Sequence, residues 1–212
     1  MSKNTRTISP RPWQARPLSS AVYDQAVAEG FTPLQARLLA GRLHALPPTP
    51  LRALVRPTVS HLPRAASLPD IDVAVEAIVD AIERELVIAV VSDSDCDGVT
   101  SASIAWRALV EVCAVPADRV HVVTAQRRKD GYGVSAGLAE RVKALRPAPQ
   151  LAITCDQGSA DQERLAELLA MGIRTVVTDH HEIPVEGPPP AAVACVNPVR
   201  ADSQFGDPRI AG

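Results

Sequence analysis

Three short polar clusters in this chain consist of the residue types that hold divalent cations. They are Asp93-Ser94-Asp95-Cys96-Asp97-Gly98, Asp156-Gln157-Gly158 and Asp179-His180-His181. Ionised carboxylates are very costly to gather in one buried place without compensation. A divalent cation removes this cost, and carboxylates with a few imidazoles suit Mn²⁺ or Mg²⁺ better than a thiolate-preferring metal. The number of candidate ligands predicts two ions bridged by one carboxylate, as in the hydrolysis of phosphate esters.

Each cluster follows an apolar run that has the length and β-branched composition of a buried strand. The predicted strands are residues 86–91, 120–124, 151–155, 175–178 and 192–196, and the predicted helices between and before them are residues 71–85, 99–114, 135–145 and 160–172. This alternation predicts an α/β fold with a mostly parallel, doubly wound, five-stranded sheet. Because ligands bind at the carboxyl ends of parallel strands, the three clusters are expected to meet at one edge of the sheet.

The helix predicted at residues 71–85 has a candidate cap and a candidate core face. The Asp70 side chain is expected to cap its first turn. The apolar residues on one face, which are expected to pack on the sheet, are Ile71, Val75, Ile78, Val79 and Ile82.

The first third of the chain differs from the rest in charge and in proline content. Residues 1–64 carry nine Lys or Arg and only two acidic residues, and ten of the nineteen prolines lie within residues 1–69. We therefore expect a basic, Pro-rich helical extension at residues 1–69, with one or two short helices at 20–46 and an extended connector at 46–70. The second domain is expected at residues 70–212. A basic arm over residues 1–20 suggests contact with a polyanion, and the alternative is a solvated tail.

Cysteine usage and hydropathy exclude two classes of protein. The four cysteines stand alone, without a C-x-x-C pair, which argues against a disulfide framework and a zinc ribbon and favours a reducing cytoplasm. No apolar stretch approaches the roughly 18 residues of a membrane helix, so no membrane partner is expected.

The first cluster also resembles three common structures, each of which fits the sequence less well. An EF-hand loop also begins D-x-D-x-D-G, but its twelfth residue would be Glu, and here it is Ile104. A haloacid-dehalogenase-type phosphatase uses a strand-terminal D-x-D-G-x-T, which matches Asp95 to Thr100, but it gives no task to the Asp-His-His cluster. A capped, solvated turn is common for one such cluster, but not for three at one sheet edge.

The stretches "SDSDCDGVTSASI", "ITCDQGSA" and "VVTDHHEIP" resemble the first three motifs of the DHH phosphoesterase superfamily. The segments "TAQRRKDGYGVS" and "VNPVRADSQFGDPRIAG" further resemble RecJ-type single-strand-specific exonucleases. In these enzymes an Arg precedes an acid-Gly-Tyr-Gly stretch, and an Asn-Pro follows the Asp-His-His motif. The resemblance spans roughly residues 20–212.

This resemblance implies 5′-to-3′ hydrolysis of single-stranded DNA by a two-metal mechanism with Mn²⁺ or Mg²⁺. The residues it assigns to the metals are Asp93, Asp95, Asp97, Asp156 as the bridging ligand, and His180. His181 and Asp179 are the implied catalytic residues, with His181 facing the scissile phosphate. Arg127, Arg128 and Tyr132 are the implied nucleic-acid contacts. Single-stranded DNA is the expected partner, and single-strand-binding or replication and repair proteins are further candidates.

Five residues around the expected ligands depart from the family pattern, namely Ser92, Ser94, Cys96, Gln157 and Ser159. The family's fourth-motif aspartate and its DHH-associated domain are expected beyond Gly212, which would make residues 1–212 a truncated form that binds one Mn²⁺ well and cuts DNA feebly or not at all. Two alternatives stay open. One is a non-catalytic DHH module that binds single strands or a replication or repair partner. The other is a DHH-type oligonucleotide or cyclic-dinucleotide phosphodiesterase.

Overall fold

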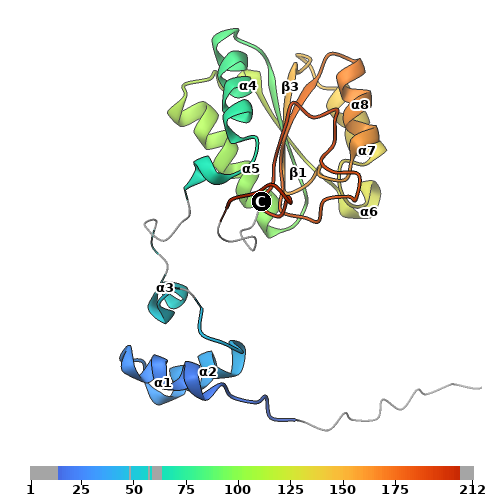
Figure 1. The fold of residues 1–212 in the computed structure, drawn as a ribbon. Coiled ribbons are helices and arrows are strands. Elements are labelled where there is room, and N and C mark those ends of the chain that lie inside the picture. Colours follow the sequence, from blue (N-terminus) through green and yellow to red (C-terminus); the bar gives the residue numbers. More distant parts are fainter. Residues whose placement is uncertain (1–13, 48, 57, 59–63, 206–212) are drawn as a thin grey trace, which may run out of the picture. The chain divides into compact units, whose positions relative to one another are not determined.

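The computed structural model describes residues 14–47, 49–56, 58 and 64–205, and the chain separates into two compact units, residues 1–62 and 63–212 (Figure 1). Residues 1–13 of the predicted basic arm lie outside the described residues. The assignment of residues 1–69 and 70–212 as separate domains stays a prediction.

The described part of the first unit contains three helices, which are α1 (Ser20–Ala28), α2 (Pro33–Arg42) and α3 (Leu51–Val55). A reciprocal capping box between Thr32 and Gln35 starts α2. The Glu29 carboxylate accepts the backbone N–H groups of Leu51 and Arg52 at 3.1 and 2.9 Å, and so caps α3. The prediction of one or two short helices at 20–46 is confirmed, since there are two, whereas the prediction of an extended connector at 46–70 is wrong at α3 and at the 3₁₀ turn Ala65–Ser67.

The second unit is a three-layer α/β structure around a five-stranded sheet. Its strands are β1 (Ile88–Ser92), β2 (Val120–Thr124), β3 (Leu151–Cys155), β4 (Arg174–Thr178) and β5 (Ala194–Val196). All pairings are parallel, in the order β2-β1-β3-β4-β5. The doubly wound parallel sheet is therefore confirmed. The strand order reverses between β1 and β3, which is the place where such sheets bind ligands.

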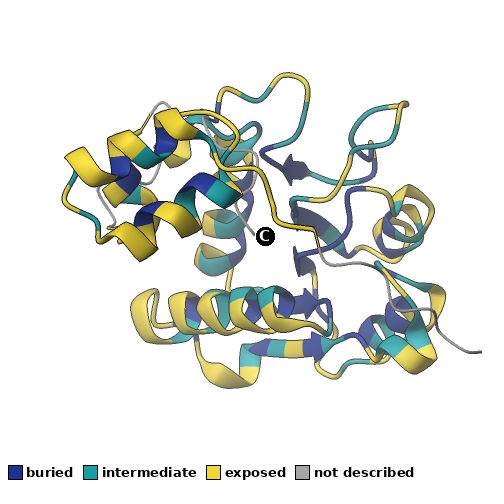
Figure 2. Ribbon diagram, turned by 90° about the horizontal axis from the view of Figure 1, so that it is seen from below, coloured by how far each residue is buried: buried dark blue, intermediate teal, exposed yellow. Residues whose placement is uncertain are grey.

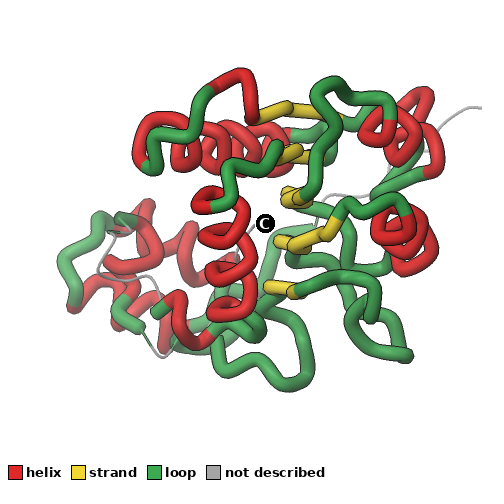
Figure 3. Tube along the Cα trace, turned by 90° about the horizontal axis from the view of Figure 1, so that it is seen from above, coloured by secondary structure: helices red, strands yellow, loops and turns green. Residues whose placement is uncertain are grey.

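Helices cover both faces of the sheet, as Figure 3 shows with the strands seen nearly end-on between them. The helices of this unit are α4 (Ile71–Glu83), α5 (Cys96–Arg107), α6 (Arg127–Asp130), α7 (Ala136–Lys143) and α8 (Gln162–Ala170). One core cluster joins α4 and α5 to the sheet, and the other joins α7 and α8 to the opposite face. Alternate residues of each strand enter the two clusters: Val90 faces α5 while Val91 faces α7.

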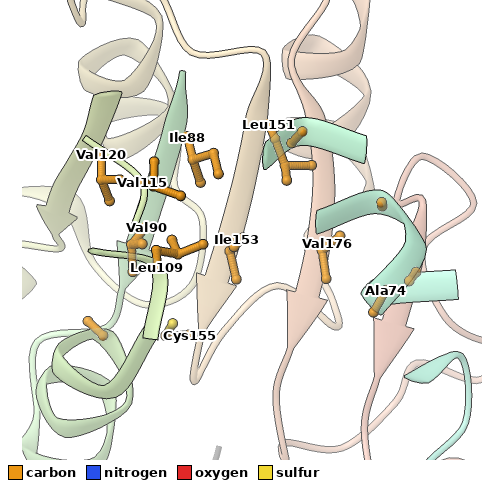
Figure 4. Packing of buried hydrophobic residues seen from close by; sticks show 14 of the residues in the cluster. Ala74, Ile88, Val90, Leu109, Val115, Val120, Leu151, Ile153, Cys155 and Val176 are labelled. Atoms are coloured by element: carbon orange, nitrogen blue, oxygen red, sulfur yellow. The ribbon is translucent and has the colours of Figure 1, made fainter. Parts of the chain in front are cut away.

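The core is built from small and branched aliphatic side chains, because the chain has few aromatic residues. Figure 4 shows Ile88, Val90, Leu109 and Ile153 packed in the layer that α5 covers. Figure 2 shows the strands as the buried centre of the unit, with the outer faces of the helices exposed. Of the helices that the structure describes, none is both long and apolar enough to cross a bilayer.

The start and the packing face of α4 differ from the prediction. Asp70 has a left-handed backbone with φ 56°, and its side chain makes no capping hydrogen bond to α4. Its carboxylate instead accepts the Cys195 backbone N–H at 3.0 Å and an Arg200 N–H. The predicted apolar face is wrong at Val75 and Val79, which are 51% and 44% exposed. The residues that pack deepest on the sheet are the alanines Ala74, Ala77 and Ala81, because small side chains let a helix approach the sheet closely.

The boundaries of α5 also differ from the prediction. The helix begins at Cys96 rather than at residue 99, and its last turn continues as a π-helical turn over Ala108–Val112. Asp95 is its N-cap and accepts the Gly98 backbone N–H at 3.4 Å. Asp97 therefore lies in the first turn of a helix, not in the loop after β1. The helix α6 was not predicted, and the other strands and helices of this unit agree with the predicted ones to within two residues.

Candidate metal centre

The three polar clusters meet at the carboxyl edge of the sheet, as predicted. The strands are in register there, with Ser92 opposite Cys155 and Cys155 opposite Thr178. Each cluster then begins with an aspartate whose backbone N–H extends the ladder by one bond. Asp93 donates to Cys155 O at 3.2 Å, Asp156 to Thr178 O at 2.9 Å, and Asp179 to Val196 O at 3.1 Å. The sheet thus fixes the three aspartates at one level.

The first cluster is held by a tight strand-to-helix turn. The Asp93 side chain is buried, and its Oδ1 accepts the Ser94 backbone N–H at 2.6 Å and the Ser94 hydroxyl at 3.2 Å. Gly98 packs against this turn so closely that a Cβ there would lie 2.7 Å from the Asp93 carbonyl oxygen. Only glycine therefore lets the first turn of α5 sit beneath Asp93 and direct the Asp95 carboxylate to the same edge.

Asp156 lies at the centre of the site. It is 1% exposed and has a left-handed backbone with φ 64°. One ligand atom from each of Asp156, His180 and His181 lies within 4.8 Å of the other two, and the same holds for Asp93, Asp95 and Asp156. Asp156 is the residue that these two triads share, which is the arrangement that a bridging ligand requires.

The electrostatic surroundings of Asp156 call for a positive partner. Burial, followed by the negative charges of Asp97 and Asp95, raises the pKa of Asp156 to about 7. Its Oδ1 is buried without a well-aligned hydrogen bond, although His180 Nε2 lies 3.0 Å away. A buried carboxylate oxygen without a donor is costly. The donor set, which is oxygen with imidazole nitrogen, fits Mn²⁺ or Mg²⁺.

Asp179 orients the histidine pair. Its buried carboxylate accepts the His180 and His181 backbone N–H groups at 2.8 and 3.1 Å, and it contacts His181 Nδ1 at 2.7 Å. Its other oxygen accepts the Ser159 backbone N–H at 2.9 Å. Burial alone would raise the pKa of Asp179, but the hydrogen bonds from Ser159 and His181 hold this pKa below its ordinary value. Because a carboxylate only accepts, Nδ1 of His181 carries the proton, and Nε2 is the ring atom left for chemistry.

The two imidazoles have different surroundings. His180 Nε2 lies 3.0 Å from Asp156 Oδ1 and 3.7 Å from Asp97 Oδ2, so it faces the acidic cluster. The His181 side chain is 59% exposed, compared with 26% for His180. Burial alone would lower the pKa of His181, but the hydrogen bond to Asp179 raises it overall. The contact of Asp97 with the site is the one that it makes with His180, and Asp97 belongs to neither of the triads found among the described residues.

The predicted nucleic-acid contacts do not all reach the site. Arg127 does: its Nη2 lies 2.8 Å from Asp93 Oδ2 and 3.2 Å from Asp95 Oδ2. Tyr132 is 78% exposed, and its ring packs under the Arg127 guanidinium at 3.9 Å. Arg128 is exposed on the same short helix as Arg127, and no ion pair joins it to the described part of the chain. The roles assigned to these residues, and to each ligand, stay predictions.

Asn197 is a residue of the site whose task the sequence did not reveal. It is completely buried after β5, and its Nδ2 donates to the Ser159 hydroxyl and to the His181 carbonyl oxygen, each at 2.9 Å. Its Oδ1 accepts the Val199 backbone N–H at 2.9 Å. Asn197 therefore ties the histidine segment to the end of the neighbouring strand. Its position directly after an apolar strand is the same signal that marked Asp93, Asp156 and Asp179.

Four of the five residues that depart from the family pattern make side-chain or backbone contacts at this edge, and the fifth, Cys96, is an exposed free cysteine. Ser92 donates to the Thr124 hydroxyl at 3.1 Å, Gln157 donates to the Val91 carbonyl at 3.2 Å, and Ser94 and Ser159 bond the ligand-bearing turns as described above.

A cavity of about 210 Å³ opens beside the site between Tyr132, Asp161 and His181. A larger hollow, of about 570 Å³, is lined by residues 182–188 and 199–202 and contains none of the predicted ligands.

Comparisons with known proteins identify relatives of this chain. The single-stranded-DNA-specific exonuclease RecJ of Salmonella typhimurium is 34% identical over 145 residues, which are 68% of this chain and 24% of that protein. RecJ of Thermus thermophilus is 40% identical over 114 residues, which are 54% of this chain and 16% of that protein. The chain thus spans about a quarter or less of the length of these relatives.

Solved structures show the same fold. A crystal structure of exonuclease RecJ bound to manganese is 31% identical, with a TM-score of 0.52 over 67% of this chain and 33% of that one. The structure of Thermus thermophilus RecJ in complex with Mn²⁺ has a TM-score of 0.57 over 88% of this chain and 24% of that one, at 24% identity. The profile of the DHH family, N-terminal domain, matches residues 87–208. This match covers more than half of the chain and all the clusters of the site, and the chain therefore belongs to the DHH family.

Proposed function

We propose that this chain carries the metal-binding part of a RecJ-like nuclease that hydrolyses phosphodiester bonds of single-stranded DNA with Mn²⁺ or Mg²⁺. The observation that carries the proposal is the pair of ligand triads that share Asp156, whose buried Oδ1 has no aligned donor. The similarity to RecJ proteins supports the substrate, and the manganese in the RecJ structures supports the cofactor.

Asp93, Asp95 and Asp156 would hold one ion. Asp156 and His180 of the other triad would hold the second ion together with Asp97, whose Oδ2 lies 3.7 Å from His180 Nε2, while His181 of that triad would be left free for the proton. When bound, such ions polarise phosphoryl oxygens and lower the pKa of water. Asp179 holds the proton on Nδ1 of His181, so that Nε2 can exchange a proton with an oxygen of the scissile group. Asn197 and Ser159 keep this histidine segment in place.

The strand contacts are proposed for Arg127, which pairs with the acids of the site, for Tyr132, which lines the cavity there, and for Arg128, which is exposed on the same short helix as Arg127. Arg supplies a planar fork that matches a phosphate, and an exposed Tyr ring can stack on a base. The same proposal has three further parts. Hydrolysis starts from the 5′ end, the nuclease acts in DNA repair or recombination, and it contacts single-strand-binding or replication proteins. A cytoplasmic location also belongs to it, and it is supported by four cysteines that are free in the structure.

The proposal is tested by measuring Mn²⁺ binding by calorimetry and the release of label from 5′- and 3′-labelled single strands. We expect Mn²⁺ to bind, Asp156→Ala to lose most of this binding, and any cleavage to require Mn²⁺ and a single strand. Asp118→Ala, an exposed aspartate just before β2 at the opposite edge of the sheet, is the matched control and should behave as wild type. Unchanged Mn²⁺ binding in Asp156→Ala would refute the site. Strand binding without cleavage would favour the non-catalytic module only if a form extended to the length of the RecJ relatives also failed to cut, because residues 1–212 alone are expected to cut feebly or not at all.

A further inference from the structure

We propose that the Arg127 guanidinium is a built-in competitor for one of the two cations, and that its displacement couples the loading of that cation to the binding of a phosphate. This inference rests on the proposed function, because it concerns the same carboxylates. Nη2 of Arg127 bridges Asp93 Oδ2 at 2.8 Å and Asp95 Oδ2 at 3.2 Å, and its Nε donates to the Ser94 hydroxyl at 3.3 Å. The guanidinium therefore takes the two carboxylate oxygens that a cation in this triad would need.

The two triads are unequal in this respect. Asp93 and Asp95 are both paired with Arg127. Among the ion pairs of the described residues, none joins an Arg or Lys to Asp156, Asp97 or Asp179, and the basic side chains nearest to these three carboxylates are the two histidines. A cation entering between His180 and Asp156 displaces no guanidinium. A cation entering between Asp93 and Asp95 must break a charge-assisted bridge, one end of which is on the buried Asp93. The two ions should therefore bind with different affinities.

The displaced guanidinium has a place to go. The Arg127 side chain is 33% exposed and stacks on the ring of Tyr132, which is itself exposed at the mouth of the site. This stacking can keep the guanidinium near the site when its carboxylate partners are taken. Released there, it presents its N–H fork to an anion, and a phosphate group matches that fork in geometry and charge. A phosphate should thus stabilise the displaced Arg127 and favour the second cation, and by reciprocity the second cation should favour the phosphate.

Mn²⁺ titrations that resolve two sites test this inference in the 212-residue chain, by calorimetry and by electron paramagnetic resonance of free Mn²⁺. Arg127→Gln removes the bridge, and Lys129→Gln removes one charge from the same short helix without touching the acids, as an exposed control. We expect Arg127→Gln to bind the second Mn²⁺ about tenfold more tightly than Lys129→Gln, as suits a partly buried bridge rather than a surface pair. Arg127→Lys keeps the charge but not the fork, so it should lie between them.

The coupling is tested by repeating the titrations with thymidine 5′-monophosphate, which has no internucleotide bond to cut. The nucleotide should tighten the second Mn²⁺ site several-fold in wild type and in Lys129→Gln, and clearly less in Arg127→Gln. Equal second-site affinities in Arg127→Gln and Lys129→Gln, or equal nucleotide effects, would overturn the inference while leaving the metal site intact. Absence of any Mn²⁺ binding in wild type would overturn the proposed function, and this inference with it.

Discussion

Replacing Asp156 by Asn should stabilise the metal-free protein at neutral and alkaline pH. Asp156 is buried, and its pKa is raised to about 7 from an ordinary 3.8, by burial and then by Asp97 and Asp95. Asn has nearly the same shape and tolerates the left-handed backbone at this position. The substitution therefore removes the charge while preserving the turn.

The direction follows from proton linkage. Well below the ordinary pKa of 3.8 the carboxyl is protonated in both the folded and the unfolded chain, so its charge has no effect on stability. As the pH rises to about 7, the unfolded chain loses this proton while the folded protein keeps it, and the free energy of unfolding falls. A difference of about 3 pH units corresponds to at most about 4 kcal/mol, at 1.36 kcal/mol per unit. Asp156→Asn should thus be more stable than wild type by less than about 1 kcal/mol near pH 4 and by about 2–4 kcal/mol at pH 8.

Urea denaturation at pH 4, 6 and 8 with a chelator present measures this difference. Trp106 lies in α5 and reports on the sheet unit once the other tryptophan is removed by Trp13→Phe. Asp118→Asn is the control and should show no such pH dependence. With saturating Mn²⁺ at pH 8, wild type should instead become more stable than Asp156→Asn, because Mn²⁺ stabilises the native state only of a protein that binds it. A stability difference that does not change between pH 4 and pH 8 would show that the Asp156 charge is not the cause.

Two further substitutions test how the site is built. Gly98→Ala should destabilise the sheet unit by about 1–3 kcal/mol in thermal melts and weaken Mn²⁺ binding, because its Cβ would lie 2.7 Å from the Asp93 carbonyl oxygen. Gly41→Ala, in the last turn of α2, is the control and should be neutral or stabilising in the same melts. Asn197→Ala should lower the free energy of unfolding by about 1–3 kcal/mol, because it leaves the buried partners of the Asn197 amide unpaired. It should also weaken Mn²⁺ binding, because Asn197 holds the histidine segment in place. An Mn²⁺ affinity equal to that of wild type in calorimetry would contradict this positioning role.

The sheet and its acidic edge could be predicted from the sequence because both depend on local patterns. The strands β2 and β3 match the predicted residues 120–124 and 151–155, since each is a short apolar run followed by polar residues. The parallel order then brings the strand ends together without any further information. The meeting of Asp93, Asp156 and Asp179 was therefore predictable from topology alone.

The errors occur where a long-range contact overrides a local signal. Asp70 has the residue type of an N-cap, but its carboxylate is engaged by Cys195 and Arg200, which are far away in the sequence. The alternation of Val75 and Val79 with Ile78 indicated an apolar face, but the closely packed alanines of α4 decide which face meets the sheet. The start of α5 at Cys96 was accessible in principle, because Asp95 is a good N-cap residue, but the run of aspartates also resembles an irregular turn.

The aspartates can lie close together because hydrogen-bond donors stabilise most of their carboxylate oxygens. Asp179 is satisfied by backbone N–H groups and His181, and Asp93 by Ser94 and Arg127. The fold therefore supplies donors to most of the charge that it gathers. Asp156 Oδ1 is the exception at the centre, and it lies 3.0 Å from His180 Nε2. A site in which the outer carboxylates are satisfied by the protein and the central one is not directs a cation to the shared ligand first. The carboxylates bridged by Arg127 then become the position whose occupancy can be regulated.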